Sequence, residues 1–399
     1  MEKSFLNFKN DKELFSFIRF VNIPEIPPLK SIFKKYNFEE IELNELLSNI
    51  PEKRFLIIDA RSESEFESSH LSNAINFPVL NNSERHYVGN LYKNYSQKSA
   101  IWLAMEYANI KKESLKKFIN NNLTLDSKSV YVYCWRGGGR SKYLSSMISD
   151  LFPNLKINIL KKGFKSYRNI VNEFFENEIN DYKFIELTGL TGCNKSKLIE
   201  FCSGKIPTIN LENAARHQSS LFGDIPYTLR GLPSIKDQSS FENNLFNDFI
   251  LNRTFYKKRH FLIESESRKI GNFNIPKNLF RKISESPSIL VESEIEYRIK
   301  TIKEDYFGNN LEGLDLIRER FINKGDFFKQ QLSKDLYYEM LEALNEVNVD
   351  KFIEYMLVRY YDIRYKNKGK KPVLVLKNNN LEETAGKLTD FLKNYGYTD

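Results

Sequence analysis

A cysteine, three glycines and two arginines lie close together in the segment VYVYCWRGGGRSKYL. An apolar run ends at Cys134, glycines 137–139 follow, and a helical pattern begins near Arg140. Consecutive glycines let several backbone N–H groups point at one centre, and the following helix directs the positive end of its dipole there. With the charges of Arg136 and Arg140, this arrangement stabilises a thiolate. We predict that Cys134 is a catalytic nucleophile and that both arginines hold an anion. A buried structural cysteine beside a glycine turn is the alternative.

A phosphate-binding loop is the second candidate, in KFIELTGLTGCNKSKLIEF. The segment fits the template G-x-x-x-x-G-K-[ST], except that Asn194 stands where the template has its second glycine. Asn is the non-glycine residue that best tolerates left-handed backbone, so we expect the turn to form. Backbone N–H groups would cradle a phosphate, the lysine would add its charge, and the serine would bind Mg²⁺. The predicted phosphate or diphosphate site consists of Gly189, Thr191, Gly192, Lys195 and Ser196; a plain glycine turn is the alternative.

Acidic residues follow another apolar run, in HFLIESESRKIG. If this run is a strand in the sheet of the phosphate loop, Glu264, Glu266 and Arg268 lie at its carboxyl edge, beside the phosphate site. There they would bind Mg²⁺ or orient a nucleophile. A solvated charged turn is the alternative. The other two cysteines, Cys193 and Cys202, are expected to pack in the core.

The elements that must position these residues form two series. Residues 1–36 read as an N-terminal extension, in which the prolines of VNIPEIPPLK fix an extended connector. In residues 37–178, the apolar runs RFLIIDA, AINFP, VYVYCW and KINIL alternate with helical patterns. In residues 179–399, KFIELTG, PTINLE, HFLIES, SILVES and PVLVLK do the same, and residues 310–366 have mostly helical periodicity. The predicted fold class is α/β, with two parallel-sheet domains, the second of which has a helical C-terminal region.

Composition limits the kinds of protein this can be. A chain of 399 residues with 41% hydrophobic and 14% aromatic residues can bury two cores. No apolar run approaches the roughly 20 residues of a membrane span, and the N-terminus lacks the apolar core of a signal peptide. Three scattered cysteines suit neither a disulfide framework nor a zinc site, so we expect a cytoplasmic protein. The net charge of +8 favours a polyanionic partner, although a general richness in Lys and Asn would also produce it.

The first series resembles the rhodanese superfamily, in which a loop cysteine carries sulfur or selenium. The segment IIDARSESEFESSHLSNAINFP is similar to the family's strand, Asp-x-Arg turn and His-x-x-x-Ala-Ile-Asn stretch. Five residues separate Cys134 from Arg140, a spacing shared with the cysteine phosphatases related to rhodaneses. A loop of that width suits a tetrahedral anion such as selenophosphate. Asp59 and His70 match family positions and are expected to hold the loops together.

A rhodanese domain followed by a phosphate-loop domain resembles the bacterial tRNA 2-selenouridine synthases. The resemblance covers roughly residues 50–395 and includes NNSERHYVGNLYK, NLENAARHQSSLFG, IESESRKIG and VRYYDIRY. It implies that wobble 2-thiouridine is first S-geranylated from geranyl diphosphate and that selenophosphate then supplies selenium. It implies that Cys134 delivers selenium while Arg136 and Arg140 hold the donor's phosphate. Arg216 and His217 would contact ligand, with structural hydrogen bonding as the alternative.

The resemblance also implies partners. The anticodon arm of tRNA would be bound, an enzyme supplying selenophosphate is a possible partner, and no cofactor is held tightly apart from optional Mg²⁺ at Ser196. The tracts FYKKRH at 255–260 and YKNKGKK at 365–371 combine basic with aromatic residues, which suits tRNA contact, although such tracts are often solvated faces.

Two other functions fit parts of the sequence. The wide loop of Cys134 would suit a phosphatase-like or phosphotransferase enzyme that acts on a phosphoester, but the loop offers no evident general acid. A non-catalytic module that binds anions at both loops would leave the combination of Cys134, two arginines and Lys195 unexplained.

Overall fold

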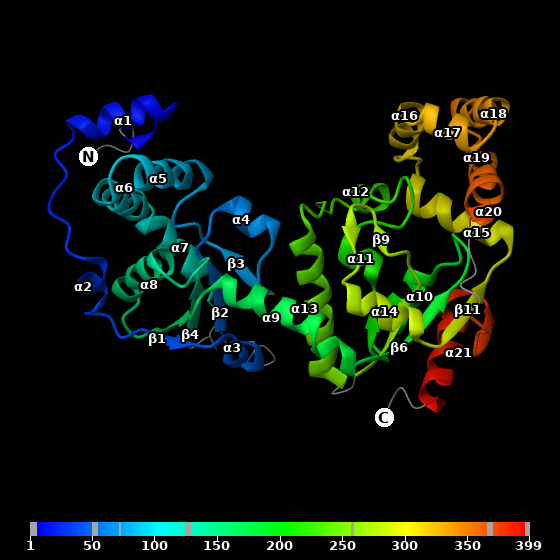
Figure 1. Cartoon of the computed structure of the whole chain (residues 1–399), viewed down its shortest axis with the longest axis horizontal. Helices are drawn as coiled ribbons and strands as arrows, with labels where there is room; N and C mark the ends of the chain where they lie inside the picture. The colour runs from blue at the N-terminus through cyan, green and yellow to red at the C-terminus, as the bar shows by residue number, and fades with distance from the viewer. Residues whose placement is uncertain are drawn as a thin grey trace. The chain divides into compact units, whose positions relative to one another are not determined.

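The chain forms two compact units, each built on its own parallel sheet (Figure 1). In this computed structural model, the described residues are 6–49, 55–71, 73–123, 129–232, 234–256, 259–364 and 370–395. The first unit spans Met1–Ile170 and the second Val171–Asp399. None of the helices in these ranges combines the length and the apolar character that a membrane span requires.

The first unit has a five-stranded sheet in the order β1-β5-β4-β2-β3, with every pair parallel. Its central strand carries an uninterrupted buried run, Val130 to Cys134, as expected where helices cover both faces of a parallel sheet. The strands are β1 (Glu39–Ile41), β2 (Phe55–Asp59), β3 (Ala74–Asn76), β4 (Ser129–Tyr133) and β5 (Lys156–Leu160). The helices are α1 (Asp11–Phe20), α2 (Leu29–Phe33), α3 (Leu43–Asn49), α4 (Glu63–Ser68), α5 (Asn82–Asn94), α6 (Gln97–Ile110), α7 (Lys112–Asn122), α8 (Gly139–Leu151) and α9 (Phe164–Glu176).

Part of the predicted N-terminal extension packs on the core of the first unit. Asn10 caps α1 by accepting a hydrogen bond from the Glu13 N–H. Leu14 and Ile18, one helical turn apart, are buried against that core. Residues 22–28, which contain the prolines, have no regular secondary structure, in agreement with the predicted connector. The extension is therefore held by apolar contacts of its own.

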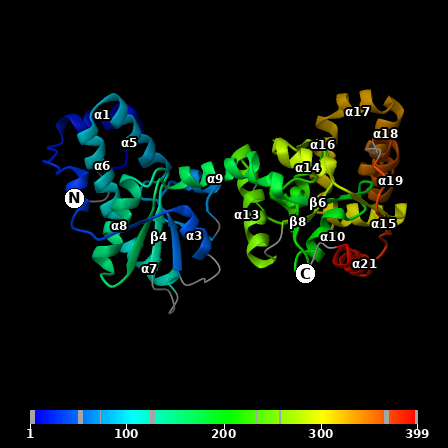
Figure 2. The same ribbon diagram turned by 60° about the horizontal axis from the view of Figure 1, so that its bottom comes forward.

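The second unit has a five-stranded parallel sheet in the order β12-β11-β6-β8-β7, with β6 in the middle. Figure 2 labels β6 and its neighbour β8. Its strands are β6 (Lys183–Thr188), β7 (Thr208–Ile209), β8 (His260–Glu264), β11 (Ser288–Glu292) and β12 (Leu374–Lys377), and β9 (Lys269–Ile270) and β10 (Phe273–Asn274) form a separate antiparallel pair. Around the sheet lie η3 (Glu178–Asp181), α10 (Lys195–Cys202), α11 (Leu211–Ala215), α12 (Ile225–Leu229), α13 (Gln238–Tyr256), α14 (Lys277–Glu285), α15 (Ile295–Ile302) and α21 (Leu381–Asn394).

A helical subdomain, residues 303–364, is inserted before the last strand. It consists of α16 (Leu314–Asn323), α17 (Gly325–Gln331), α18 (Lys334–Asn345), α19 (Val349–Tyr355) and α20 (Asp362–Arg364), with two π-helical segments, η4 (Lys303–Phe307) and η5 (Met356–Tyr361). It has its own aromatic-rich core, in which Phe321 packs against Phe328, Tyr337 and Phe352. The predicted α/β class and helical C-terminal region are confirmed. The sequence interpretation missed β1 and the β9–β10 pair, which are only two or three residues long.

Candidate active sites

The loop of Cys134 lies where β4 ends and α8 begins. The cysteine side chain is 4% exposed, and its Sγ lies 3.3 Å from the Oγ of Ser141 in the first turn of α8. The same Oγ lies 3.1 Å from the Gly138 carbonyl oxygen, to which it can donate its one proton. A Cys134 thiolate would compete for that proton and would lie beside the N-terminus of α8. Two groups could therefore stabilise a Cys134 thiolate: the Ser141 hydroxyl, as a hydrogen-bond donor, and the N-terminus of α8.

A second loop fixes the backbone around Cys134. Gly163, just before α9, has φ of +57°, and a Cβ placed on it would lie 2.0 Å from the Cys134 carbonyl oxygen. That oxygen accepts a hydrogen bond of 2.9 Å from the Phe164 N–H, and the Trp135 oxygen accepts one of 3.0 Å from the Lys165 N–H. Only glycine allows the two loops to approach this closely.

The two arginines predicted to hold an anion differ in their surroundings. Arg140 pairs with Glu65 of α4, with 2.6 Å between Nη1 and Oε2. Burial would raise the pKa of Glu65, but the hydrogen bond and charge of Arg140 outweigh it and hold that pKa below its ordinary value. Arg136 is exposed at the loop surface. An anion bound in the loop would therefore contact the solvent-exposed side chain of Arg136. It would also compete with Glu65 for hydrogen bonds from Arg140.

Asp59 and His70 hold neighbouring loops in place, as the sequence predicts. Asp59 is fully buried and forms a two-pronged ion pair with Arg61, with 2.7 Å between Oδ2 and Nη2. The Arg61 guanidinium also donates to the Ser69 carbonyl and stacks 3.9 Å from the centre of the Phe164 ring. The His70 ring stacks on Phe66 and bonds its carbonyl oxygen at 2.9 Å.

The phosphate loop lies between β6 and α10 and borders a cavity of about 570 Å³. All five residues predicted for this site line the cavity: Gly189, Thr191, Gly192, Lys195 and Ser196. The Lys195 Nζ folds back on the loop, where it donates to the carbonyl oxygens of Gly189 at 2.9 Å and Leu190 at 3.3 Å. Cys193 and Cys202 are fully buried in the core beside the loop, as predicted.

Asn194 takes the place of the template glycine without loss of the turn. Its φ and ψ of 60° and 32° lie in the left-handed region, as predicted. Its Nδ2 donates to the Tyr297 hydroxyl at 3.1 Å and to the Thr301 Oγ1 at 3.0 Å. Both partners lie on α15, so the asparagine side chain ties the phosphate loop to that helix.

Two carboxylates converge on the hydroxyl of Ser196. Its Oγ lies 2.5 Å from Oε2 of Glu212 and 2.7 Å from Oε2 of Glu264, and the other Glu264 oxygen accepts from the Glu212 N–H at 2.6 Å. Burial raises the pKa of Glu212; burial, followed by the charge of Glu212, raises that of Glu264 well above its ordinary value. A hydroxyl has only one proton to donate, so the second contact requires a protonated carboxyl or a cation.

These three oxygen groups are of the type that Mg²⁺ prefers. In the described ranges, no group of three or more His, Cys, Asp and Glu side chains is suited to hold a metal. A Mg²⁺ at Ser196 would therefore need ligands from substrate or water besides Glu212 and Glu264, which is the usual way in which Mg²⁺ binds beside phosphates.

The remaining predicted residues differ in whether they line the cavity. Glu266 lines the cavity, whereas Arg268 is exposed and is not among the described residues that line it.

Arg216 and His217 are also not among the described residues that line the cavity. The Arg216 backbone is left-handed and ends α11, and the His217 N–H donates to the Glu212 carbonyl at 3.1 Å. Burial lowers the pKa of His217, whose ring packs against Gly223 and Gly271. These backbone bonds end α11 next to Glu212, and ligand contact by the side chains of Arg216 and His217 stays a prediction.

Several cavity residues were not singled out from the sequence. Glu212 lies three residues after β7, and Glu264 ends β8; this shared position near the carboxyl ends of neighbouring strands was the signal that could have revealed it. Asp305 of η4 lies 2.8 Å from Lys197 and 3.7 Å from Arg230, which places two cations at the cavity. No sequence spacing indicates that pairing.

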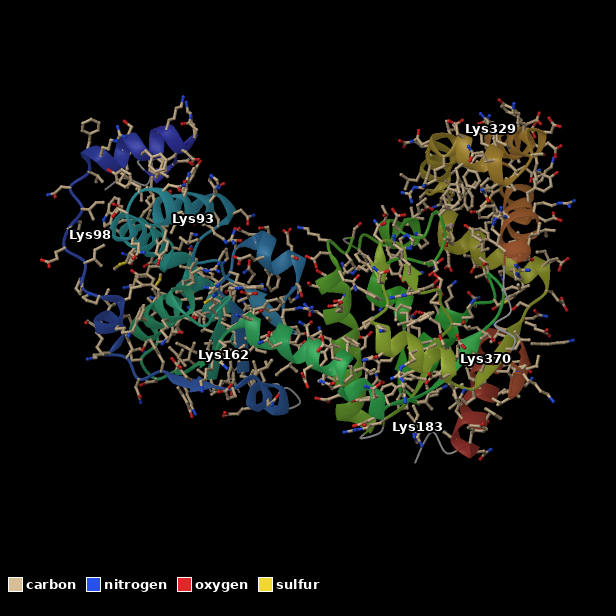
Figure 3. All side chains as sticks on the ribbon, viewed as in Figure 1. Lys93, Lys98, Lys162, Lys183, Lys329 and Lys370 are labelled. Atoms are coloured by element: carbon tan, nitrogen blue, oxygen red, sulfur yellow. The ribbon has the colours of Figure 1, made fainter. Side chains whose placement is uncertain are left out.

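The two basic tracts predicted for tRNA contact lie mostly outside the described residues. Of FYKKRH at 255–260, only the side chains of Arg259 and His260 are described, and Arg259 pairs with Asp181 at 2.6 Å. Of YKNKGKK at 365–371, only the last two residues are described. Lys370, labelled in Figure 3, lines the cavity and binds the buried Glu186 at 2.6 Å.

Comparisons with known proteins match a family to each part of the chain. A family model described as the tRNA 2-selenouridine synthase AAA domain matches residues 182–394, and a rhodanese-like domain model matches residues 42–170. Proteins named tRNA 2-selenouridine synthase from Marinobacter nauticus and Bdellovibrio bacteriovorus are each 29% identical to this chain. The two matches cover 81% and 68% of this chain, and 89% and 69% of the relatives. One from Sulfurovum sp. is 30% identical, over 65% of this chain and 67% of its own length.

Proposed function

Because the chain belongs to the tRNA 2-selenouridine synthase family, we propose that it converts wobble 2-thiouridine of tRNA to 2-selenouridine in two steps. The first step transfers a geranyl group from geranyl diphosphate to the sulfur, and the second replaces that sulfur with selenium from selenophosphate. The anticodon arm of tRNA is the macromolecular substrate, and an enzyme that makes selenophosphate in the cytoplasm is the expected supplier. One observation supports this proposal most: the first unit places Cys134 beside the N-terminus of α8, and the second places Lys195 and Ser196 at a cavity of about 570 Å³, so the two loops differ in chemistry.

The phosphate loop of the second unit would serve geranyl transfer. The base sulfur attacks C1 of geranyl diphosphate, the C1–O bond breaks, diphosphate leaves, and the base loses its N–H proton to solvent. The loop N–H groups and Lys195 would stabilise the negative charge that develops on the leaving diphosphate. To do so, Lys195 would give up its hydrogen bonds to the carbonyl oxygens of Gly189 and Leu190. Mg²⁺, when bound, supplies further positive charge there. Ser196, Glu212 and Glu264 are the residues that would hold it.

The loop of Cys134 would serve the exchange of sulfur for selenium. A new bond forms between C2 of the base and selenium, the C2–S bond breaks, geranyl thiol leaves with a proton, and water releases phosphate from selenium. Cys134 would assist this delivery without forming a bond to selenium: its thiol gives the proton with which geranyl thiol leaves and regains one from the water that releases phosphate. Its Sγ lies beside a hydroxyl donor and the N-terminus of α8. Arg136 and Arg140 would hold the phosphate of the donor, with Glu65 holding Arg140 in place until the anion arrives.

Nucleoside analysis of tRNA tests this function. We expect tRNA from host cells that contain the chain to carry 2-selenouridine when selenium is supplied, and S-geranyl-2-thiouridine when it is withheld. Cells that lack the chain should retain 2-thiouridine under both conditions. Identical nucleosides with and without the chain would contradict the proposal.

A phosphatase-like activity is the second candidate, because five residues separate Cys134 from Arg140. It predicts hydrolysis of a generic aryl phosphate that stops in Cys134→Ser. The selenium-delivery proposal predicts no such turnover by either protein.

A further inference from the structure

A small apolar pocket lies directly behind the phosphate cavity. Its volume is about 40 Å³. Five residues line both spaces, so the two adjoin: Thr191, Ser220, Ile302, Tyr306 and Tyr361. Thr191 belongs to the phosphate loop itself. A ligand whose phosphates bind Lys195 therefore has an apolar space beside it, on the side of Thr191.

The walls of this pocket come from both π-helical segments of the second unit. Tyr306 and Phe307 belong to η4, and Met356, Leu357 and Tyr361 belong to η5. A π-helical turn is rare and less favourable than an α-helical one, and such turns are frequent at functional sites. Two of them meet at one pocket here, although their sequences lie about 50 residues apart.

Hydroxyl groups mark the boundary between the polar and the apolar space. The Tyr306 hydroxyl lies 2.8 Å from the Ser220 Oγ, and the Tyr361 hydroxyl accepts from the Leu221 N–H at 3.4 Å. Burial raises the pKa of both phenols, so both are neutral at physiological pH. A neutral rim on an apolar pocket suits a hydrocarbon group and does not suit a second charged group.

We propose that this pocket receives the far end of the isoprenoid chain and determines its length, an inference that rests on the proposed geranyl transfer. The pocket has room for only about three water molecules. A ten-carbon chain must therefore displace side chains as it enters. Met356 is suited to move, because its unbranched side chain has three rotatable bonds and it lies at the start of η5. Binding of the chain thus opens the pocket between η4 and η5.

Substitutions at Met356 test this role in the full-length chain. Calorimetry in the presence of Mg²⁺ compares inorganic, dimethylallyl, geranyl and farnesyl diphosphate. In Met356→Phe, the larger ring fills the pocket. We expect geranyl diphosphate to bind about tenfold or more weakly while inorganic and dimethylallyl diphosphate bind as in the unchanged protein. In Met356→Ala, the preference should shift from geranyl toward farnesyl diphosphate.

Met340→Ala is the matched control. Met340 is fully buried in the same helical core, but it is not among the residues that line the pocket. This variant should keep the order of preference among the four ligands. Retained binding of inorganic diphosphate shows that each variant is folded.

Three results would overturn the inference. The first is that both Met356 variants keep the unchanged protein's preference among chain lengths, and the second is that geranyl diphosphate binds no better than inorganic diphosphate. Either result would show that the pocket does not bind the isoprenoid chain, but it would leave the proposed phosphate site unaffected. If neither ligand binds the unchanged protein, the proposed geranyl transfer itself is wrong, and this inference fails with it.

Discussion

At the scale of single residues, Lys195 is placed to exchange one set of partners for another. Its Nζ bonds two carbonyl oxygens of its own loop, at 2.9 and 3.3 Å, and a diphosphate would replace both. Neutral oxygens are weaker partners for an ammonium group than phosphate oxygens, so the exchange favours the anion. The sequence template identified this residue, because its position relative to the glycines is set by the loop backbone.

We predict that Lys195→Ala abolishes measurable binding of geranyl diphosphate, a loss of about 2–5 kcal/mol if the charge pair is desolvated. Calorimetry on the full chain measures it, with Lys205→Ala, on the exposed turn after α10, as the control that keeps binding. Tight binding of ATP together with no binding of geranyl diphosphate by the unchanged protein would show that the loop serves a nucleotide instead.

Asp248 on α13 has no role in either site but makes stability depend on pH. Burial raises the pKa of this half-buried carboxyl to about 7, from 3.8 in an unfolded chain. The folded protein therefore holds a proton that the unfolded chain releases. The stability that this provides is complete below pH 3.8 and is lost as the pH rises through about 7.

We predict that Asp248→Asn raises the free energy of unfolding at about pH 8 by on the order of 2 kcal/mol, raises it by less at about pH 5, and changes it little at about pH 3.5. Thermal unfolding across this range measures the difference. Asp390→Asn, on the exposed face of α21, should follow the unchanged protein at every pH. Parallel curves for Asp248→Asn and the unchanged protein would rule out the buried proton.

At the scale of elements, the sites depend on contacts between loops. Gly163 precedes α9, and its missing Cβ lets it approach the Cys134 carbonyl oxygen. We predict that Gly163→Ala costs about 1–3 kcal/mol in unfolding free energy, because its φ is positive and the added Cβ would displace the cysteine loop. Selenium incorporation should be lost and geranylation retained.

A glycine inside a helix provides the control for this prediction. At Gly386 in α21 a Cβ would meet no atom within 4 Å, so Gly386→Ala should raise stability by about 0.5–1 kcal/mol and leave both reactions intact. Denaturant unfolding and nucleoside analysis report the two effects separately. Normal selenium incorporation by a folded Gly163→Ala protein would contradict the account of the loop.

The elements also show what the sequence could and could not reveal. Apolar runs of five or six residues predicted the longer strands, because parallel strands are buried on both faces. The two-residue pairs of β9 and β10 carry no such pattern. The pairing of Arg140 with Glu65 spans 75 positions, and no local spacing indicates it. Glu212 was missed although PTINLE was predicted as a strand: β7 covers only Thr208–Ile209, and Glu212 lies three residues beyond it, in α11.

At the scale of the whole molecule, α9 belongs to both units. Its N-terminal residues Phe164 and Tyr167 are buried in the first unit. Phe174 packs against Phe246 and Phe249 in the second. The sequence interpretation placed the domain boundary after residue 178, at the end of the helical pattern. A cut there leaves Phe174 out of the second unit, so tests of function require the full chain.

The charge of the whole chain predicts how it binds tRNA. With a net charge of +8, we expect phosphate contacts to dominate, and each contact releases counterions. The affinity of the full chain for the anticodon arm should fall about 100-fold or more between about 50 and 200 mM salt. Fluorescence anisotropy with a labelled anticodon stem–loop measures it. An affinity that changes less than about threefold over that range would show that charge does not drive binding.

The central claim is that two sites in one chain perform successive steps on one base. The most direct test is mass spectrometry of the nucleosides formed by the purified full chain from 2-thiouridine tRNA, geranyl diphosphate and selenophosphate. The account predicts 2-selenouridine from the unchanged protein, S-geranyl-2-thiouridine from Cys134→Ala, and unmodified 2-thiouridine from Lys195→Ala. Cys202→Ala, which alters a buried cysteine whose pKa is raised by burial, should behave as the unchanged protein does. Formation of 2-selenouridine by Cys134→Ala, or by the unchanged protein without geranyl diphosphate, would contradict the account.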